Sequence, residues 1–462
     1  MQRQQKTTEV GCPCEGMLEA ERIKGAQSIV SLEKVGEDSA GSLLERILSR
    51  DNLNAAYKRV KQNGGAAGID AMTVEGMLPY LQEYREELLE RLRSGRYRPQ
   101  AVRRVEIPKA SGGTRKLGVP TVIDRMIQQA MVQVLQPIFE KTFSGSSYGF
   151  RPKRSAHQAI QQALEYCKAG FTQVVDIDLA KYFDTVNHDI LIEMVRAEVS
   201  DERVITLMRK YLKSGVMVDG LYHPTEEGTP QGGNLSPLLS NIYLTAFDRM
   251  LESRGHKFVR YADDCNIYVK SRRAAERVME SSVKFLEGEL KLTVNREKSQ
   301  TGSPLKLKFL GFSLYKVKGK MGIRPHQESL KRFKEKIREL TSRKQARPVE
   351  QILNRIKQYT RGWLGYYAIA DMASRIKELN EWTRRRIRQI YWKQWKRASA
   401  RFENLMRLGI DRGKAWEWAN SRLGYWRVSL SWILTRSLTN EYLASAGYDD
   451  ISQRYEALHQ SY

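Results

Sequence analysis

The sequence predicts a mixed α/β (α+β) region up to about residue 325, followed by a region of helices alone. Apolar runs of strand length alternate with helical apolar spacing as far as residue 312, and no strand pattern follows residue 326. The excess of basic over acidic residues rises at the same point, since residues 331–400 contain 20 Lys and Arg against 6 Asp and Glu. With 462 residues, 41% of them hydrophobic, the chain is long enough for two or more domains with their own cores.

The formal net charge of +25 predicts a polyanionic partner. Nucleic acid is the leading candidate and an anionic membrane surface the weaker one. No apolar run approaches the ~20 residues of a membrane helix. The first ten residues lack the apolar core of a secretory signal, so we expect a soluble, cytoplasmic protein of bacterial type. Cys12 and Cys14 lack the second pair of ligands that a zinc site needs, and Cys167 and Cys265 are expected to be buried, reduced thiols.

The expected elements follow from apolar spacing and from the residues that interrupt it. Residues 1–42 show little periodicity and are expected to be a loose leader. Segment 102–120 alternates and is interrupted by glycines, which predicts a hairpin. The other expected elements are a helix from Leu43, a glycine-rich loop at 61–70, a helix at 74–93, a helix at 124–139, a buried strand at 171–179, helices from 181 to 213, a loop at 228–237, a helix at 238–251, a hairpin at 257–269, a helix at 273–290 and short strands at 292–295 and 308–312.

Two adjacent acids stand at the tip of an apolar hairpin, in Tyr261-Ala262-Asp263-Asp264. Like charges this close repel each other, and a divalent cation removes that cost. Mg²⁺ takes hard oxygen ligands and binds through one or two carboxylates together with substrate phosphates. The tetrapeptide therefore indicates a Mg²⁺ site for phosphoryl or nucleotidyl transfer, with an ordinary solvated turn as the alternative.

A second acidic segment, Asp176-Ile177-Asp178, ends the strand expected at 171–179. A polymerase needs a second carboxylate strand because two metal ions, ~3.5–4 Å apart, clamp the attacking and leaving oxygens. Asp176 and Asp178 share one strand face, so their spacing does not choose between them, and either could cap a helix instead.

Basic residues that could hold an incoming triphosphate lie on the first hairpin, at Lys109 and Arg115. Arginine offers a bidentate contact to phosphate. The loop Gln231-Gly232-Gly233 lets backbone approach a nucleotide without obstruction by Cβ atoms. These segments predict nucleotide contacts to accompany the acids.

Residues 381–395 carry an apolar stripe at helical spacing, and basic residues decorate the other sides, at Arg384, Arg385, Arg388 and Lys396. Such a helix fits a nucleic-acid groove, and a solvated surface helix is the alternative. Because the run belongs to a region-wide excess of base, we favour binding. Residues 416–462 are aromatic and basic, which predicts a small helical module whose aromatic residues are mostly core.

Seven short segments stand in one order along the chain. They are Arg103-Arg104-Val105-Glu106-Ile107-Pro108-Lys109, Gly118-Val119-Pro120-Thr121-Val122-Ile123-Asp124-Arg125, Tyr148-Gly149-Phe150-Arg151-Pro152, the strand ending at Asp178, Gly228-Thr229-Pro230-Gln231-Gly232-Gly233, Tyr261-Ala262-Asp263-Asp264 and Phe309-Leu310-Gly311-Phe312. In this order they resemble the segments of group II intron-encoded reverse transcriptases and maturases, over residues 43–462.

The resemblance implies the domains. Residues 43–325 would form the fingers and a ferredoxin-like palm of a right-hand polymerase, with an N-terminal extension at 43–75 whose glycine-rich loop covers the template. Residues 326–415 would form a helical thumb or maturase (X) domain, in which 361–367 matches a turn between thumb helices. Residues 416–462 would form a DNA-binding region.

The resemblance also implies the catalytic acids. The family's first acidic motif has an aromatic gate five positions later, which selects Asp178 with Phe183 over Asp176, which has Lys181 there. Two Mg²⁺ ions, replaceable by Mn²⁺, would be held by Asp178, the backbone carbonyl of Leu179, Asp263 and Asp264.

The nucleotide contacts are implied in the same way. Phe183 would exclude a ribose 2′-OH, although it could equally be a core aromatic residue. Lys109 and Arg115 would bind the triphosphate, and Gln231 would lie near the nascent base pair. Lys298 would protonate pyrophosphate, with a surface lysine as the alternative.

The implied partners are the parent intron RNA, an RNA template with its DNA primer, dNTPs and target DNA, with no membrane. Many relatives end in a Cys-paired HNH endonuclease. Because no cysteine follows Cys265, we expect this endonuclease to be absent, as in the short class encoded by IIC introns. A maturase-only splicing factor and a reverse transcriptase of phage defence or CRISPR systems are the alternatives.

Overall fold

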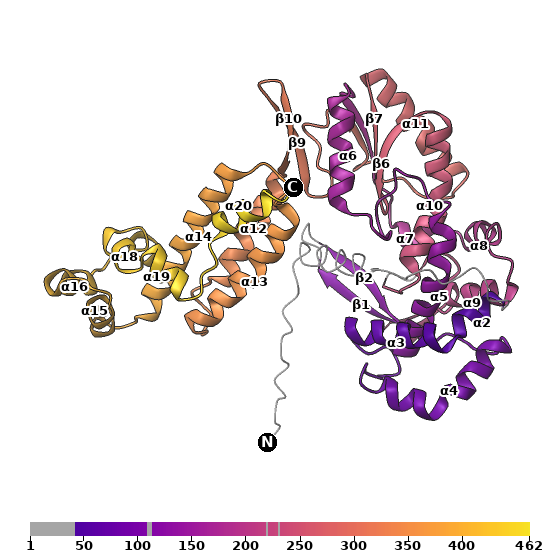
Figure 1. The fold of residues 1–462 in the computed structure, drawn as a ribbon, viewed down its shortest axis with the longest axis horizontal. Helices are drawn as coiled ribbons and strands as arrows, with labels where there is room; N and C mark the ends of the chain where they lie inside the picture. Colours follow the sequence, from indigo (N-terminus) through magenta and orange to yellow (C-terminus); the bar gives the residue numbers. More distant parts are fainter. Residues whose placement is uncertain (1–41, 109–112, 219, 230–231) are drawn as a thin grey trace. The chain divides into compact units, whose positions relative to one another are not determined.

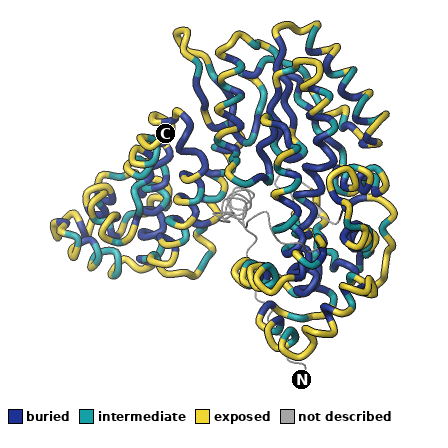
Figure 2. Tube along the Cα trace, turned by 45° about the vertical axis from the view of Figure 1, so that its right-hand side comes forward, coloured by how far each residue is buried: buried dark blue, intermediate teal, exposed yellow. Residues whose placement is uncertain are grey.

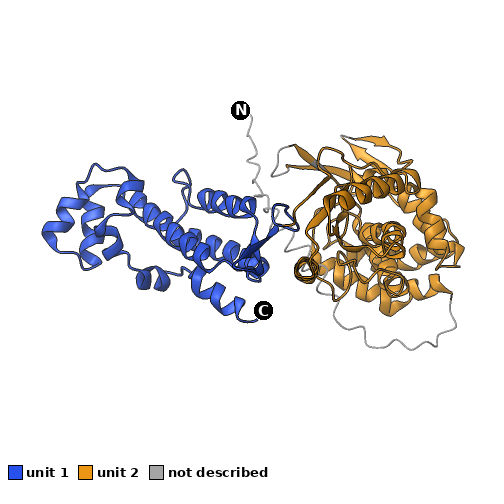
Figure 3. Ribbon diagram, turned by 90° about the horizontal axis from the view of Figure 1, so that it is seen from above, with its two compact units in different colours: residues 1–22, 305–462 blue, residues 23–304 orange. Residues whose placement is uncertain are grey.

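The computed structural model describes residues 42–108, 113–218, 220–229 and 232–462. The leader expected at 1–42, with Cys12 and Cys14, lies outside the described residues except for Ser42. The chain divides into two compact units, which Figure 3 colours separately. We call the described part of residues 23–304 the mixed unit and the described part of residues 305–462 the helical unit.

None of the helices in the described ranges is long and apolar enough to cross a membrane.

The mixed unit begins with helices, two of which pack against the long helix α5 (Val122–Glu140). These two are α2 (Leu43–Leu48) and α3 (Arg50–Asn63), and α4 (Met77–Arg93) follows them. Ser49 has an extended backbone, which divides the helix expected from Leu43 into α2 and α3. The other helices of this unit are α6 (Ala156–Lys168), α7 (Tyr182–Thr185), α8 (His188–Arg196), α9 (Glu202–Leu212), α10 (Ser236–Ser253) and α11 (Arg272–Gly288).

A first sheet has the strand order β2-β1-β4-β5. The expected hairpin is present as β1 (Val102–Pro108) and β2 (Thr114–Val119) in antiparallel register. Two further strands, β4 (Val216–Val218) and β5 (Leu221–His223), were not expected because three residues carry too little alternation to be recognised.

A second, fully antiparallel sheet has the order β6-β7-β3-β8. Its strands are β3 (Gln173–Ile177), β6 (Lys257–Tyr261), β7 (Asp264–Val269) and β8 (Gln300–Gly302). Helix α10 precedes β6 and helix α11 joins β7 to β8, which gives the connectivity of a split βαβ, ferredoxin-like sheet with β3 in the centre. Figure 1 shows α6, α10 and α11 beside this sheet, and these helices contact its strands.

The second sheet and the helices of this unit share one contiguous apolar core. Most residues of α5 and α10 are buried, so both helices lie inside this unit, and Figure 2 shows the buried segments in dark blue. The strand expected at 292–295 is reduced to a single bridge between Val294 and Leu179. Cys167 and Cys265 are buried free thiols, as expected, and burial raises the pKa of Cys167 to about 12.

The helical unit begins with a hairpin that was not expected, β9 (Phe312–Val317) and β10 (Lys320–Pro325). The ring centre of Phe312 lies 5.2 Å from that of Tyr366 and 5.0 Å from that of Tyr367. The Asp371 amide donates to the carbonyl of Ile323 at 2.8 Å. Because this hairpin packs on helices, the compact units divide after residue 304, earlier than the boundary expected at 325.

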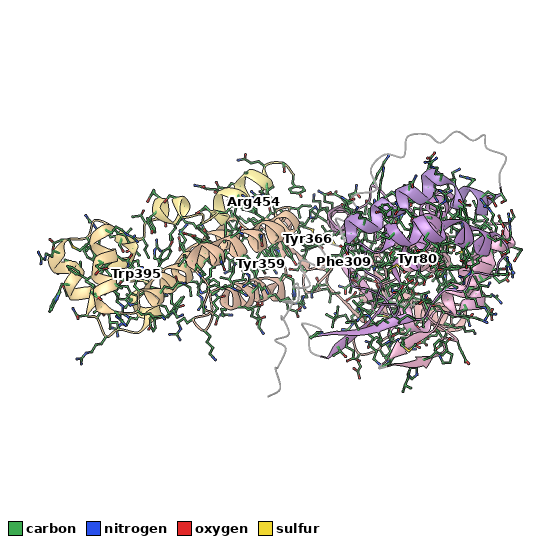
Figure 4. The ribbon with its side chains drawn as sticks, turned by 90° about the horizontal axis from the view of Figure 1, so that it is seen from below. Tyr80, Phe309, Tyr359, Tyr366, Trp395 and Arg454 are labelled. Atoms are coloured by element: carbon green, nitrogen blue, oxygen red, sulfur yellow. The ribbon has the colours of Figure 1, made fainter. Side chains whose placement is uncertain are left out.

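The strand expected at 308–312 is a single bridge between Phe309 and Phe312 that leads into β9. The Tyr366 hydroxyl donates to the carbonyl of Leu310 at 2.8 Å, and Figure 4 shows Phe309 and Tyr366 close together. Segment 361–367 is not the turn that we expected. It is the end of a helix because Trp363, Leu364 and Tyr367 are buried at helical spacing.

The remaining elements of the described residues are helices. They are α12 (Gln327–Leu340), α13 (Val349–Tyr367), α14 (Ala373–Gln394), α15 (Ala398–Arg407), α16 (Arg412–Ala419), α17 (Tyr425–Val428), α18 (Trp432–Ser437), α19 (Asn440–Ser445) and α20 (Ile451–His459).

Candidate active site

Three acids stand at one end of the second sheet. Strand β3 pairs with β7 so that Ile177 lies opposite Cys265. One position further along this register, Asp178 follows β3 and lies level with Asp264, the first residue of β7. Asp263 occupies the two-residue turn that the pair Tyr261 and Asp264 closes. The fold therefore brings together the carboxylates that the sequence placed more than eighty positions apart.

The turn between β6 and β7 has an unusual backbone. Ala262 has a φ of 58°, in the left-handed region that residues with a Cβ rarely occupy. Such a conformation costs about 1–2 kcal/mol, so surrounding contacts must hold it. It directs the chain sharply from β6 into β7 and presents Asp263 at the tip, while Asp264 is exposed.

Asp176 and Asp178 have different environments. The side-chain amide of Asn266 donates to Asp176 at 3.1 Å, and burial raises the pKa of Asp176 to about 6. Asp176 lies within β3, opposite Asn266 on one side and Gln300 on the other. Asp178 lies beyond the strand end, level with the turn. The internal partners of Asp176 favour a structural role and support the assignment of the catalytic role to Asp178.

The segment after β3 is fixed from the side of β8. The Asp178 amide donates to the Ser299 hydroxyl at 3.0 Å, and the Asp178 carbonyl accepts from the Asn295 amide at 2.9 Å. The Ala180 amide donates to the carbonyl of Thr293 at 2.8 Å. In an antiparallel bridge of this kind, the intervening residue directs its own N–H and C=O the other way. The Leu179 carbonyl therefore faces the side of β7, where the acidic turn lies.

Lys298 is a cation that lies near Asp178. Its Nζ is 3.9 Å from Oδ2 of Asp178, and 69% of the side chain is exposed. The contact is too long for a strong ion pair and leaves the ammonium free to turn toward a bound phosphate.

Phe183 lies on α7, directly after the first acidic segment. Its ring is half-buried and packs edge-on against Tyr182, with ring centres 5.2 Å apart. The Tyr182 hydroxyl donates to the carbonyl of Ser240 at 3.0 Å, which ties α7 to α10. Phe183 accepts a hydrogen bond at its carbonyl from the Thr229 amide at 2.6 Å. The backbone at Phe183 is thus fixed, and its ring packs on Tyr182 while keeping exposed surface.

The expected triphosphate contacts are only partly described. Lys109 and Gln231 lie outside the described residues. Arg115 lies on β2 opposite Ile107, and its side chain is also outside the described part. Gly228 has a φ of 87° and lies against the backbone of Phe183 and Asp184, so the loop that leads to Gln231 begins at the aromatic residue.

The acids fit a metal that shares its coordination with a substrate. Within the described ranges, no group of three or more His, Cys, Asp or Glu side chains is close enough to form a protein-only metal site. Mg²⁺ does not require one, because it commonly binds one or two carboxylates and takes its other ligands from water and phosphate. The carboxylates of Asp178, Asp263 and Asp264 supply the hard oxygen donors that this mode needs.

Sequence reasoning missed a buried network beneath the acids. Arg260 and Asp248 form an ion pair with side chains only 1% and 0% exposed. Asn241, which is fully buried, is the third member. The available signal was an arginine inside the otherwise apolar run Phe258–Ala262, together with an aspartate inside the apolar helix α10.

The glycine-rich loop expected to cover a template is held by two arginines. Arg125 donates to the carbonyls of Gly64 and Ala66, each at 3.0 Å. Arg103 donates twice to the carbonyl of Ala67, at 3.0 and 2.8 Å. The loop is therefore a fixed part of the mixed unit.

The arginines expected to bind nucleic acid on α14 are engaged within the helical unit. Arg384 pairs with Asp450 at 3.0 Å, and Arg385 lies with its guanidinium carbon 3.7 Å from the ring centre of Trp426. Arg388 is buried and donates to the carbonyl of Leu438 at 3.0 Å. Lys396 is exposed just after the helix. Arg384 and Arg388 thus have structural contacts that the basic-face interpretation did not anticipate, and nucleic-acid binding by this set stays a prediction.

Two family models match the chain. The model for reverse transcriptase (RNA-dependent DNA polymerase) matches residues 107–314, and the model for the group II intron maturase-specific domain matches residues 330–409. The first match contains all three acids, and the second covers most of α12 and all of α13, α14 and α15.

Similar proteins were also found by comparison of whole sequences. Protein YkfC of Escherichia coli (strain K12) is 38% identical over 275 residues, which cover 51% of this chain and 71% of that protein. The group II intron-encoded protein LtrA of Lactococcus lactis subsp. cremoris is 35% identical over 275 residues, which cover 57% of this chain and 45% of LtrA. The chain thus spans less than half the length of LtrA.

A solved structure, described as a partial Cas6-RT-Cas1–Cas2 complex, is 21% identical with a TM-score of 0.35, over 57% of this chain and 46% of that one. The two matched domains, together with the sequence identity to YkfC and LtrA, are sufficient to assign the protein to a family. The chain belongs to the group II intron-encoded reverse transcriptases, which are RNA-directed DNA polymerases that also carry a maturase domain.

Proposed function

We propose that the protein extends a DNA primer along an RNA template at the acidic end of the second sheet, with Asp178, Asp263 and Asp264 as the catalytic acids. The observation that carries this proposal is the register of β3 and β7, which sets Asp178 level with Asp264. In this proposal the second sheet is the palm, and the first sheet with α2 to α5 contributes the fingers. The helical unit is the thumb, maturase domain and DNA-binding region.

The three carboxylates and the Leu179 carbonyl would hold two Mg²⁺ ions, for which Mn²⁺ could substitute. When bound, such ions stabilise the attacking and leaving oxygens of the transferred phosphoryl group. The primer 3′-hydroxyl attacks the α-phosphorus of the dNTP, a new P–O bond forms, and pyrophosphate leaves. Lys298, whose Nζ lies 3.9 Å from Asp178, would donate a proton to that pyrophosphate, and the alternative is that it is a surface lysine only.

Selection of the sugar is assigned to Phe183. The Thr229 amide holds the backbone carbonyl of Phe183, and the ring packs against Tyr182, which limits how far the ring can move away from a ligand. A ribose 2′-OH placed against it would clash, whereas a deoxyribose would not. Lys109, Arg115 and Gln231 are proposed to contact the triphosphate and the nascent base pair.

The maturase function is proposed to rest on RNA binding by the helical unit. The excess of base over residues 331–400 favours a polyanion without any chemistry at the acids. The proposed partners are the parent intron RNA for splicing and target DNA for retrohoming. Binding of this kind weakens steeply as salt rises.

Primer extension tests the polymerase assignment. An RNA template annealed to a DNA primer is supplied with dNTPs and Mg²⁺, and the wild type is compared with Asp263→Ala. Extension by the wild type alone is expected. Equal extension by both proteins would place the active site elsewhere.

Filter binding of the parent intron RNA by the same two proteins separates the functions. Asp263→Ala should bind RNA as tightly as the wild type, because Asp263 is not part of the basic surface. If neither protein extends a primer while both bind RNA, the protein is a splicing factor alone.

A further inference from the structure

The side chain of Arg260 is fully buried directly before the acidic turn. Arg260 is the fourth residue of β6 and precedes Ala262 by two positions. Its Nε donates to Oδ1 of Asp248 at 2.7 Å and its Nη2 to Oδ2 at 2.5 Å, a bidentate pair between β6 and α10. A buried ion pair of this kind is weak evidence for stability, because an apolar pair of similar volume often serves as well.

The third nitrogen of Arg260 reaches the turn itself. Nη1 donates to the carbonyl of Ala262 at 2.8 Å and to Oδ1 of Asn241 at 3.0 Å. Ala262 is the residue with the left-handed backbone. The guanidinium therefore holds the carbonyl of the one strained residue in the turn, at the peptide that leads into Asp263. An apolar replacement could fill the volume but could not make this contact.

A second segment closes the turn from the other side. The side-chain amide of Asn241 donates to the carbonyl of Gly149 at 2.8 Å. A Cβ at Gly149 would lie only 2.2 Å from the Ala262 nitrogen, so the two backbones are in direct contact. The Arg260 amide donates to the carbonyl of Ser146 at 2.9 Å, and its carbonyl accepts from the Tyr148 amide at 2.8 Å. The turn is thus fixed between residues 146–149 and α10.

We propose that Arg260, held by Asp248 and Asn241, is a positioning residue that sets the place of Asp263 and Asp264 for metal binding. The inference rests on the proposed function, since it assumes that these acids hold the metal. Arg260 touches neither substrate nor metal. It acts through the Ala262 peptide, whose position determines where both carboxylates stand.

The test separates positioning from stability. The double variant Arg260→Met with Asp248→Leu removes both charges together and leaves no buried charge unpaired, so it is expected to fold. We expect kcat for primer extension to fall about 10- to 100-fold, the usual effect of removing a group that orients metal ligands. The KM for dNTP should stay close to that of the wild type, because the proposed triphosphate contacts lie elsewhere.

A second readout does not depend on activity. Binding of Mn²⁺ to the full-length protein, followed by electron paramagnetic resonance, should weaken by a similar factor in the double variant. Amide hydrogen exchange at residues 261–264 should become faster. Arg260→Lys keeps a charge against Asp248, but a lysine cannot reach both Asp248 and the Ala262 carbonyl. Its kcat should therefore lie between those of the wild type and the double variant.

Leu191→Ala is the matched control. Leu191 is fully buried in α8 and is no part of the network, so this variant loses stability without a change in the turn. It should keep the wild-type kcat and Mn²⁺ affinity below its melting temperature. Equal losses in the control and in the double variant would overturn the inference, as would a double variant with wild-type kcat and Mn²⁺ binding.

Asp263→Ala distinguishes the two possible failures. If Asp263→Ala is inactive while the double variant is normal, the site stands and Arg260 does not position it. If Asp263→Ala extends primers like the wild type, the site and the role of Arg260 are both rejected.

Discussion

The mixed unit and the helical unit use buried charge in different ways. In the mixed unit, the Arg260–Asp248 pair lies beneath one strained turn, and the guanidinium donates to Asp248, to the Ala262 carbonyl of that turn and to Asn241 on α10. In the helical unit, arginines of α14 are distributed along the helix and contact several later segments. This buried pair supports one turn in the mixed unit, whereas the arginines of α14 join short helices in the helical unit.

The lengths of the helices explain the difference. Helices α17, α18 and α19 have only four to six residues and leave many backbone carbonyls without helical partners. Arg385 donates to the carbonyl of Trp426 at 3.0 Å, and Arg388 donates to that of Leu438 at the end of α18. These arginines donate hydrogen bonds to carbonyls that the short helices leave without a helical partner. The number of basic residues in a sequence therefore overstates the base that is available to nucleic acid.

The largest expected effect tests whether one carboxylate in the mixed unit can carry the chemistry. Asp178→Asn should lower kcat for primer extension by on the order of 10³-fold, because metal stabilisation of the transition state is worth several kcal/mol. Asp176→Asn, its neighbour on the same strand, should retain most of the activity since Asn266 already holds it in the sheet. The reverse result would show that the first acid of the site is Asp176.

A smaller effect is expected from the gate in the same unit. Phe183→Ala should lower the preference for dNTP over rNTP by about 10- to 100-fold, the range for filling or emptying a pocket. Tyr182→Phe is the control, because it removes the hydroxyl bond to Ser240 and keeps the ring against Phe183. Single-nucleotide incorporation with dCTP and with CTP measures this preference for both variants. An unchanged preference would make Phe183 a core residue only.

Two substitutions sharpen the view of the helical unit. Arg388→Met should lower the free energy of unfolding by about 1.5–3 kcal/mol, the value of hydrogen bonds from a charged donor. Lys396→Met should leave stability unchanged and lower the slope of log Kd against log salt for intron RNA by about 1. Thermal melts and filter binding distinguish them. A change in the salt slope for Arg388→Met at full stability would contradict the structural role.

The smallest effect concerns pH. His188 is buried, its Nε2 lies 2.6 Å from the carbonyl of Gly228, and burial lowers its pKa below the ordinary 6.5. The unfolded chain therefore binds a proton before the folded protein does. The stability that the neutral imidazole contributes is complete above pH 6.5 and declines as the pH falls toward the folded pKa. Urea unfolding at pH 7.5 and 5.5 should show a smaller decline for His188→Gln than for the wild type.

Much of the mixed unit could be predicted because its signals are local. The alternation at 102–119, the apolar arms around Asp263 and Asp264, and the apolar length of α5 each lie within one segment. The resemblance of ordered motifs then placed Asp178 with the turn. Short elements without a local pattern were not found, as β4 and β5 show.

What could not be predicted depends on contacts between distant segments. Arg260 meets Ser146 and Asn241 only after α10 and residues 146–149 pack together, and the spacing of apolar residues in the sequence does not indicate these contacts. The same reason explains why the sequence suggested a basic face on α14. Its arginines contact segments from α17 to α20 only in the folded unit. The hairpin β9–β10 did carry a local signal, alternation around Lys318-Gly319, that we overlooked.

The central position of β3 in the second sheet has a consequence during synthesis of the chain on the ribosome. Strand β3 leaves the ribosome before both of its neighbours, since the residue that pairs with Asp176 on β7 is Asn266. At ordinary elongation rates this interval lasts roughly 5–20 s, during which Val174, Val175 and Ile177 have no sheet to join. A charge within an unpaired strand discourages pairing with another chain. We expect Asp176, which the finished sheet holds at a raised pKa, to protect the nascent strand in this way, so that Asp176→Asn aggregates more than the wild type when both are made at the same rate.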